Sequence, residues 1–244
     1  MNKEMTIIIT MAGQGSRFKK AGYQEPKYMI EAKGKTLFEW SMDSLMDYNP
    51  YVKKYIFIVQ EQDDASSFIL EKCKKYQIRE VQILELDHLT DGQATTCMLA
   101  IPYCNPSDAI MVYNIDTYVE PFELKYSDIK GEGHIPCFYG AGNHWSFVKL
   151  DDNLKVTEVR EKSRISNNCS IGAYYFSSAK LFEELYNDYY TDKSNLINNE
   201  KFIAPLYNHM ISKKLECTHS IVNLDKVHVL GTPEELNIFI NKHE

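Results

Sequence analysis

The chain has 244 residues, of which 44% are hydrophobic and 25% are charged, so it holds enough apolar material for one sizeable core. Its formal net charge of -7 at pH 7 argues against nucleic acid or an anionic membrane as the main partner. These values predict one folded domain over residues 1–244.

The first half of the chain shows a regular alternation of predicted elements. Residues 6–10 are apolar and β-branched, which predicts a buried strand of a parallel sheet. Helices are then predicted at 36–47, 65–76 and 93–101, and strands at 55–59, 81–86 and 109–113. The alternation predicts an open, mainly parallel α/β sheet of the three-layer Rossmann-like kind.

The pattern changes after about residue 118. Short strands separated by turns are predicted at 135–139, 146–150, 155–160 and 170–176. Helices follow at 179–189, 202–211 and 233–241, with a strand at 219–222 between the second and the third. We therefore expect an inserted antiparallel portion, with a nucleotide half at about 1–118 and an acceptor half at about 119–244.

The first strand leads into a small-residue loop that ends in a cation. The loop reads Met11-Ala12-Gly13-Gln14-Gly15-Ser16-Arg17. Small residues let a backbone approach a ligand closely, and successive free amides form an anion-binding concavity. Arg17 adds a planar charged group suited to phosphate oxygens, and Lys27 follows the ring-locked Pro26. Together they predict a site for a polyanion such as a nucleoside triphosphate.

Two familiar glycine motifs do not fit this loop. A dinucleotide fingerprint needs a third glycine where Phe18 stands, and the full G-x-x-x-x-G-K-[ST] order of a P-loop is absent. The order G-x-G-S-R followed by P-K instead resembles the signature of the sugar-phosphate nucleotidylyltransferase superfamily. The resemblance implies that Arg17 and Lys27 are catalytic. It also implies a set of nucleotide-binding loop residues: Met11, Ala12, Gly13, Gly15 and Ser16.

Other candidate residues follow the predicted strands, because open parallel sheets bind ligands beyond the carboxyl ends of their strands. Gln60 follows the second strand and is expected at the nucleotide site. Asp116 follows the fourth, matches the strand-end Asp of the superfamily, and is the expected Mg²⁺ ligand. Gly92 and Gln93 match the segment that recognises the base in the superfamily, so the resemblance implies that they lie at the base. A glutamine side chain can both donate and accept hydrogen bonds, so the sequence does not determine which base is recognised.

The second half carries the expected acceptor site. The segment Glu158-Val159-Arg160-Glu161-Lys162 resembles the V-x-E-K element of the superfamily, which implies that Lys162 meets the acceptor phosphate and Glu161 its polar groups. Gly172 begins a G-x-Y-x-F strand and would allow a close approach to the acceptor.

The carboxyl end departs from the superfamily. Many members read D-x-G-T-P, with that Asp as a second metal ligand, whereas this chain has Val229 in its place. Asp225 is the predicted replacement, and His228 is a softer ligand than Mg²⁺ prefers.

The resemblance implies transfer of a nucleoside monophosphate to a phosphate monoester with release of pyrophosphate. The form of residues 11–30 resembles a branch associated with bacterial capsule and surface-polysaccharide assembly, for which CTP and L-glutamine phosphate are the predicted substrates. A sugar 1-phosphate with UTP, dTTP, GTP or CTP is the alternative acceptor reading. Choline phosphate and glycerol phosphate are further options. Outside this class, a metal-dependent glycosyltransferase and a non-catalytic nucleotide-binding protein stay open.

The cysteines and the N-terminal run predict an ordinary intracellular setting. Six cysteines occur with no C-x-x-C pair, as expected of reduced, packed thiols. The first apolar run is too short for a signal peptide or a membrane span, so a cytoplasmic location is expected. A homo-oligomer remains an option.

Overall fold

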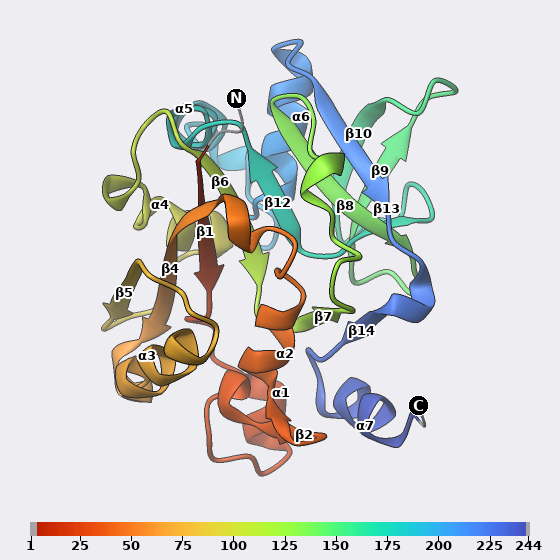
Figure 1. The fold of residues 1–244 in the computed structure, drawn as a ribbon. Helices are drawn as coiled ribbons and strands as arrows, with labels where there is room; N and C mark the ends of the chain where they lie inside the picture. Colours follow the sequence, from red (N-terminus) through yellow and green to blue (C-terminus); the bar gives the residue numbers. More distant parts are fainter. Residues whose placement is uncertain (1–3, 243–244) are drawn as a thin grey trace.

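The computed structural model describes residues 4–242 and centres on a ten-stranded mixed sheet (Figure 1). In chain order its strands are β1 (Met5–Thr10), β4 (Val52–Gln60), β5 (Val81–Leu86), β6 (Ala109–Asn114), β8 (Gly133–Tyr139), β9 (Ser146–Leu150), β10 (Val156–Glu161), β11 (Asn168–Ser170), β12 (Ala173–Phe176) and β13 (Cys217–Ile221). The strand order is β10-β9-β11-β8-β12-β6-β1-β4-β5, and β13 pairs with β8.

The helices and the smaller strands complete the described chain. The α-helices are α1 (Ser16–Lys20), α2 (Leu37–Asp43), α3 (Ser66–Lys75), α4 (Gln93–Met98), α5 (Ala179–Tyr189), α6 (Ala204–Ser212) and α7 (Pro233–Asn241). Two-stranded sheets join β2 (Glu31–Ala32) to β3 (Lys35–Thr36), and β7 (Thr117–Val119) to β14 (Val227–Val229). Short 3₁₀ helices are η1 (Lys27–Met29), η2 (Asn49–Tyr51), η3 (Glu61–Asp63), η4 (Ile101–Tyr103), η5 (Tyr126–Asp128), η6 (Lys193–Asn195) and η7 (Leu224–Lys226).

The sheet has a parallel and an antiparallel part. Strands β6, β1, β4 and β5 run parallel to one another. From β6 outward, β12, β8, β11, β9 and β10 are joined by antiparallel pairings. The open α/β architecture with an inserted antiparallel portion is therefore confirmed.

Alternate side chains of the central strands reach two separate cores, as the period of two along a strand requires. Ile7 and Ile9 of β1 lie in a core with the buried residues of α2 and α3. Ile8 lies in a second core with those of α4, α5 and α6. The result is a three-layer structure. A third, smaller core joins α1, α2, β7 and α7, which gather at the end toward which β1 points (Figure 1).

Most predicted elements lie where the sequence placed them, with two informative differences. The helix expected at 36–47 ends at Asp43, and residues 44–48 form turns. The strand expected at 170–176 is broken between β11 and β12, where Gly172 has a φ of +87°. This break lies beside the site described below.

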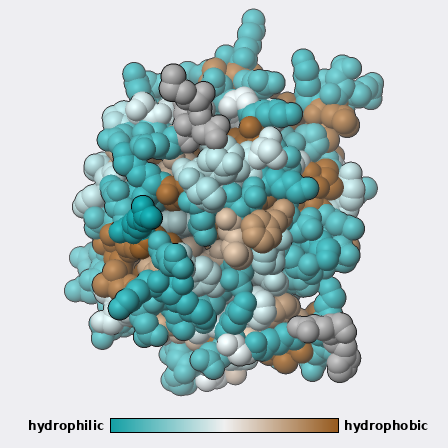
Figure 2. Space-filling model, in the orientation of Figure 1, coloured by the Kyte–Doolittle hydropathy of each residue, from teal (hydrophilic) through white to brown (hydrophobic). Residues whose placement is uncertain are grey.

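The surface is mainly polar. The face drawn in Figure 2 is predominantly hydrophilic, with apolar residues in small separate patches. In residues 4–242 we find no helix of the length and apolar character that a bilayer crossing requires. All six cysteines are free, and only Cys104 is not fully buried.

Candidate active site

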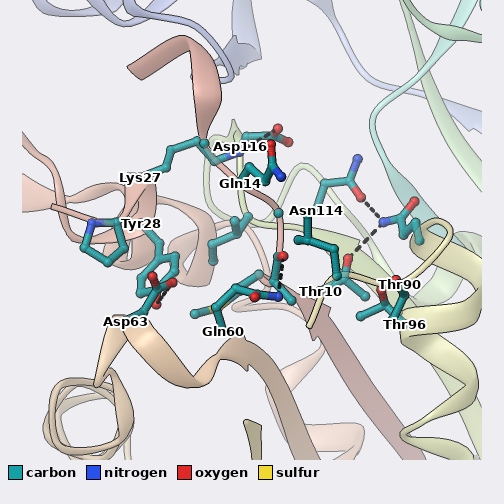
Figure 3. Close-up of a pocket in the computed structure, with 18 of the residues that line it drawn as sticks. Thr10, Gln14, Lys27, Tyr28, Gln60, Asp63, Thr90, Thr96, Asn114 and Asp116 are labelled. Carbon is teal, nitrogen blue, oxygen red and sulfur yellow. Dashed lines mark hydrogen bonds and ion pairs between the residues drawn. The ribbon is translucent and has the colours of Figure 1, made fainter. Parts of the chain in front are cut away.

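A cleft of about 390 Å³ opens at the carboxyl ends of the parallel strands (Figure 3). Segments that follow four strands line it: 10–15 after β1, 60–63 after β4, 89–96 after β5 and 114–116 after β6. Lys27 enters from the segment after α1, and Glu200 from the segment between α5 and α6. The cleft thus lies where a parallel sheet is expected to bind a ligand.

The glycine loop turns directly from β1 into α1. Gly15 has a φ of +58°, a left-handed conformation that glycine adopts without strain. Phe18 is buried and fixes α1 to the small core. Arg17 is exposed on this helix and is not among the residues that line the cleft. The predicted loop residues Met11, Ala12, Gly13 and Gly15 do line it, and Ser16 lies just outside.

The two charged groups predicted for catalysis and metal binding meet in this cleft. Lys27 Nζ lies 2.9 Å from Asp116 Oδ2, and both side chains stay partly accessible, at 20% and 34% (Figure 3). Burial alone would raise the pKa of Asp116, but the ammonium of Lys27, with Arg17 further away, holds that pKa below its usual value. The carboxylate is therefore ionised at neutral pH.

The turn that carries Asp116 is held by backbone contacts. The hydroxyl of Ser41 donates to the carbonyl of Ile115 at 2.8 Å, and the amide of Leu230 donates to the carbonyl of Asp116 at 2.8 Å. These bonds come from α2 and from the segment after β14. The position of the carboxylate is therefore fixed before any ligand arrives.

The two predicted glutamines point into the wall of the cleft. Gln60 is buried and donates to the carbonyl of Ala12 at 3.0 Å, which ties the end of β4 to the glycine loop. The amide nitrogen of Gln93 donates to Thr10 Oγ1 and to Asn114 Oδ1 (Figure 3). These nitrogens organise the cleft floor, and contact of either side chain with a base stays a prediction.

A tertiary contact that the sequence did not indicate requires glycine at position 92. It lines the cleft, but its φ is +139°, and a Cβ there would lie 2.3 Å from the carbonyl oxygen of Lys201. Only glycine fits at position 92, because the backbone of Lys201, in the second half of the chain, occupies the space that a Cβ would need. The local sequence could not reveal this contact, because the two residues are far apart along the chain.

The predicted acceptor residues lie outside the lining of this cleft. Burial in the first place, with the charge of Glu200 adding to it, raises the pKa of Glu161, and Ser146 donates a hydrogen bond to its carboxylate. Lys162 Nζ lies 4.4 Å from the centre of the Phe202 ring. Glu200, whose charge acts on Glu161, does line the cleft.

Gly172 makes its close approach to the protein itself. A Cβ on this residue would lie 2.4 Å from Nδ2 of Asn114, the side chain that accepts from Gln93. Contact between Gly172 and an acceptor stays a prediction. What the structure establishes is that the break between β11 and β12 makes room for the cleft floor.

The pairing of β14 does not favour Asp225 as a partner of Asp116 at a metal, and its role as a ligand stays a prediction. Strand β14 pairs with β7 so that Val229 lies opposite Thr117 and Val227 opposite Val119. Asp225 is therefore beyond the far end of this pair, where it is exposed. Its position in the sequence suggested a longer turn, but β14 separates it from Asp116.

A different carboxylate, Glu235, lies beside Asp116. A Cβ placed on Gly231 would be 3.4 Å from Oδ2 of Asp116 and 3.4 Å from Oε2 of Glu235, so both carboxylates face the same point. Glu235 lies in the first turn of α7, whose N-cap Thr232 accepts from its amide. The sequence signal was the acidic pair Glu234-Glu235 after Gly-Thr-Pro, which also fits an ordinary helix start.

Three solved structures are similar to this chain over nearly its whole length. The nucleoside-diphosphate-sugar pyrophosphorylase from Vibrio cholerae RC9 is 36% identical with a TM-score of 0.89, and the match covers 97% of this chain and 100% of that one. The inositol-1-phosphate CTP transferase from T. maritima has a TM-score of 0.77 at 16% identity, covering 98% of this chain and 94% of that one. A putative glucose-1-phosphate thymidylyltransferase from Bacillus anthracis has a TM-score of 0.77 at 14% identity, covering 98% and 96%. The last two similarities concern the fold alone.

A shorter match is found among curated proteins. A probable UDP-N-acetylglucosamine pyrophosphorylase from Encephalitozoon cuniculi is 36% identical over 78 residues, which is 30% of this chain. This chain spans only 20% of that protein. No protein-family model matches the sequence.

Proposed function

Since the chain belongs to the nucleoside-diphosphate-sugar pyrophosphorylase family and is a nucleotidyltransferase, we propose that it transfers CMP from CTP to a small phosphate monoester. The preferred acceptor is L-glutamine phosphate, which would give CDP-glutamine and pyrophosphate in capsule polysaccharide modification. The observation that carries nucleotidyl transfer is the meeting of Lys27 and Asp116 at 2.9 Å in a cleft walled by a glycine loop. Family membership favours this class over a glycosyltransferase or a non-catalytic binding protein.

The reaction needs no protein base. A phosphate monoester has a second pKa near 6 and is already anionic at neutral pH, so its oxygen can attack the α-phosphorus directly. A new P–O bond forms as the bond between the α-phosphorus and the bridging oxygen breaks, and pyrophosphate leaves with the bond electrons. The protein's task is alignment and charge neutralisation.

The proposed residue roles combine the layout of the cleft with the resemblance of the glycine loop, and Arg17, which lies outside the cleft lining, takes its role from that resemblance. Lys27 neutralises charge on the α-phosphate, while Arg17 and the amides of the glycine loop hold the departing pyrophosphate. Residues 1–118 supply this nucleotide half. Residues 119–244 supply the acceptor half, in which Glu161 and Lys162 are assigned to the acceptor.

The carboxylates at the cleft fit a magnesium ion. Mg²⁺ prefers hard oxygen ligands and is commonly held by one or two carboxylates together with phosphate oxygens and water. Within residues 4–242 no group of three or more His, Cys, Asp or Glu side chains is arranged to hold a metal without such help. Asp116 and Glu235 would hold the ion, which when bound lowers the negative charge of the triphosphate.

A sugar 1-phosphate is the second candidate acceptor. Two relatives favour it, a nucleoside-diphosphate-sugar pyrophosphorylase and a probable UDP-N-acetylglucosamine pyrophosphorylase. The chemistry at the α-phosphorus would be the same, so the two candidates differ only in what the acceptor half recognises.

A matrix of substrates tests both candidates. CTP, UTP, dTTP, GTP and ATP are each combined with glutamine phosphate, choline phosphate, glycerol phosphate and hexose 1-phosphates, and pyrophosphate release is measured. Release with CTP and glutamine phosphate supports the preferred assignment. Release only with UTP or dTTP and a hexose 1-phosphate would replace it with the alternative, and no release with any pair would contradict both.

A further inference from the structure

The segment 197–202, here called the strap, crosses from α5 to α6 beside the cleft. Ile197 and Glu200 exchange backbone hydrogen bonds of 2.9 and 3.1 Å. Asn198 and Asn199 between them have φ values of +53° and +62°. Asparagine tolerates this left-handed conformation better than most residues, so the strap begins with a tight and defined turn.

Lys201 of the strap is bonded to the base-recognition turn through main chain and side chain. Its amide donates to the carbonyl of Asp91 at 2.8 Å, and its carbonyl accepts from the amide of Ala94 at 3.0 Å. Its ammonium lies 2.9 Å from Asp91 Oδ2 and 3.1 Å from the hydroxyl of Tyr186. The hydrogen bond that its ammonium donates to Asp91 is the largest cause that raises the pKa of Lys201, so the ammonium stays charged.

The fit between strap and turn leaves no room for adjustment. The Cβ that Gly92 lacks would lie 2.3 Å from the carbonyl oxygen and 2.6 Å from the amide nitrogen of Lys201. The turn therefore rests directly on the strap backbone. A shift of the strap must move the wall of the cleft at Gly92 and Gln93.

The neighbours of Lys201 in the strap reach the two other parts of the site. Glu200 lines the cleft, and its charge contributes to the raised pKa of Glu161. The Phe202 ring lies under the ammonium of Lys162, at 4.4 Å. Three consecutive residues thus touch the nucleotide cleft, the base-recognition turn and the predicted acceptor residue.

We propose that Lys201 is a positioning residue for nucleotide recognition. Through Asp91 it fixes the turn at 91–93, and the strap that carries it couples this turn to the acceptor side. The inference rests on the proposed nucleotidyl transfer, because it assigns base recognition to this turn. Lys201 acts on the nucleotide through the turn and does not itself contact the reacting phosphates.

The test compares Lys201→Met, Lys201→Arg and a matched control, Lys213→Met. Lys213 also pairs with an aspartate, Asp188 at 2.7 Å, but it lies at the end of α6 away from the cleft lining. Equilibrium binding of CTP, UTP and ATP with Mg²⁺ is measured for each variant, followed by amide hydrogen exchange over residues 87–98. Steady-state KM and kcat are then measured with the best substrate pair of the wild-type protein.

Loss of a charge-assisted hydrogen bond predicts that Lys201→Met weakens binding of the preferred triphosphate about tenfold and reduces discrimination against the others. KM for the nucleotide should rise by more than kcat falls, and exchange over residues 87–98 should speed up. Lys201→Arg should keep most of the affinity, and Lys213→Met should match wild type in every measurement.

Unchanged nucleotide affinity in Lys201→Met, or unchanged exchange at 87–98, would overturn the proposal. So would an equal loss in Lys213→Met, because that result would indicate general destabilisation. If wild type binds triphosphates but releases no pyrophosphate with any acceptor, the function proposal fails. The positioning role would still stand on the affinity and exchange differences.

Discussion

The parallel and antiparallel parts of the sheet present their candidate residues in different ways. In the parallel part, β1, β4, β5 and β6 all end at the cleft, and Asp116, which follows β6, meets Lys27 there from the segment after α1, 89 positions earlier. In the antiparallel part, Glu161, Lys162 and Gly172 lie where strands end or break, and their partners come from β9, from the strap and from β6. The shared direction of the strands brings the cleft residues together, whereas contacts between distant segments position the predicted acceptor residues.

The charge-bearing parallel part should carry the largest effect on turnover. We expect Lys27→Ala to lower kcat by about a hundred- to a thousandfold, the usual result of removing one preorganised charge from a transition state. The melting temperature should change little, because its partner Asp116 is 34% exposed and can be solvated. Initial rates of pyrophosphate release and thermal melts check this, with the exposed Lys180→Ala as the control. Wild-type turnover in Lys27→Ala would contradict the catalytic role proposed for Lys27 in the nucleotide half.

Helix α2, which packs against the parallel strands, carries Glu39, whose ionised form is stabilised by the fold. Burial alone would raise the pKa of Glu39, but Lys75, Thr36 and Lys72 bond its side chain and lower that pKa to about 2. A folded pKa below the unfolded value of 4.5 contributes stability that is present above pH 4.5 and lost as the pH falls toward 2. We expect Glu39→Gln to lower the free energy of unfolding at pH 7 by roughly 2 kcal/mol.

Urea unfolding between pH 7 and pH 2.5 measures this loss. The wild type should lose stability over that range more steeply than Glu39→Gln, and Glu184→Gln on an exposed surface should follow the wild type. Parallel curves for wild type and Glu39→Gln would contradict the assigned pKa shift.

Much of the parallel part could be predicted from the sequence because its signals are local. The apolar run, the glycine loop and Pro26-Lys27 are each recognisable from a few consecutive residues. The rule that ligands bind at the carboxyl ends of parallel strands then predicts that these segments lie close together in space. Asp116 could be placed in this way, directly after an apolar strand. The roles predicted for these residues still await experiment.

The contacts that the sequence did not reveal are all between distant segments. The fit of Gly92 against Lys201 and that of Gly172 against Asn114 join different halves of the chain, and an isolated glycine carries no sign of its neighbour. The position of Asp225 relative to Asp116 could not be judged from the sequence for a related reason. A three-residue strand, β14, is too short to show a period-two pattern, yet it moves Asp225 away from Asp116 and leaves Glu235 near it.

The junction of the two parts is expected to be sensitive to one added carbon. Gly172→Ala would place a Cβ 2.4 Å from Asn114 Nδ2 on a backbone with a φ of +87°. Strain and repacking should cost about 1–3 kcal/mol and lower the melting temperature by several degrees. Because Asn114 holds Gln93, nucleotide KM should also rise. Gly22→Ala has a positive φ but open surroundings, so it measures backbone strain alone.

The two ends of β14 offer a sharper comparison. We expect Glu235→Gln to raise the Mg²⁺ concentration that gives half-maximal activity by about tenfold, as is typical when a group around a metal is lost. Asp225→Asn should leave this concentration unchanged, because Asp225 lies at the other end of the strand. Magnesium titrations of initial rate, and of thermal stability in the presence of nucleotide, distinguish the two. An effect confined to Asp225→Asn would reverse the assignment.

Glu161 of the antiparallel part should behave in the opposite way to Glu39. Burial, to which Glu200 adds, raises the pKa of Glu161, so the folded protein binds a proton that the unfolded chain has released. The associated stability is present below the unfolded pKa and is lost as the pH rises through the folded one. Glu161→Gln should therefore be at least as stable as wild type at pH 7, with no gain at pH 4.

If Glu161 also binds the acceptor, Glu161→Gln should raise the acceptor KM several-fold and leave the nucleotide KM unchanged, since its carboxylate lies outside the cleft lining. Stability and acceptor affinity would then move in opposite directions, which a purely structural residue would not produce. A rise in the nucleotide KM instead would indicate that Glu161 acts at the nucleotide cleft, which would contradict the assignment of nucleotide and acceptor to separate halves of the chain.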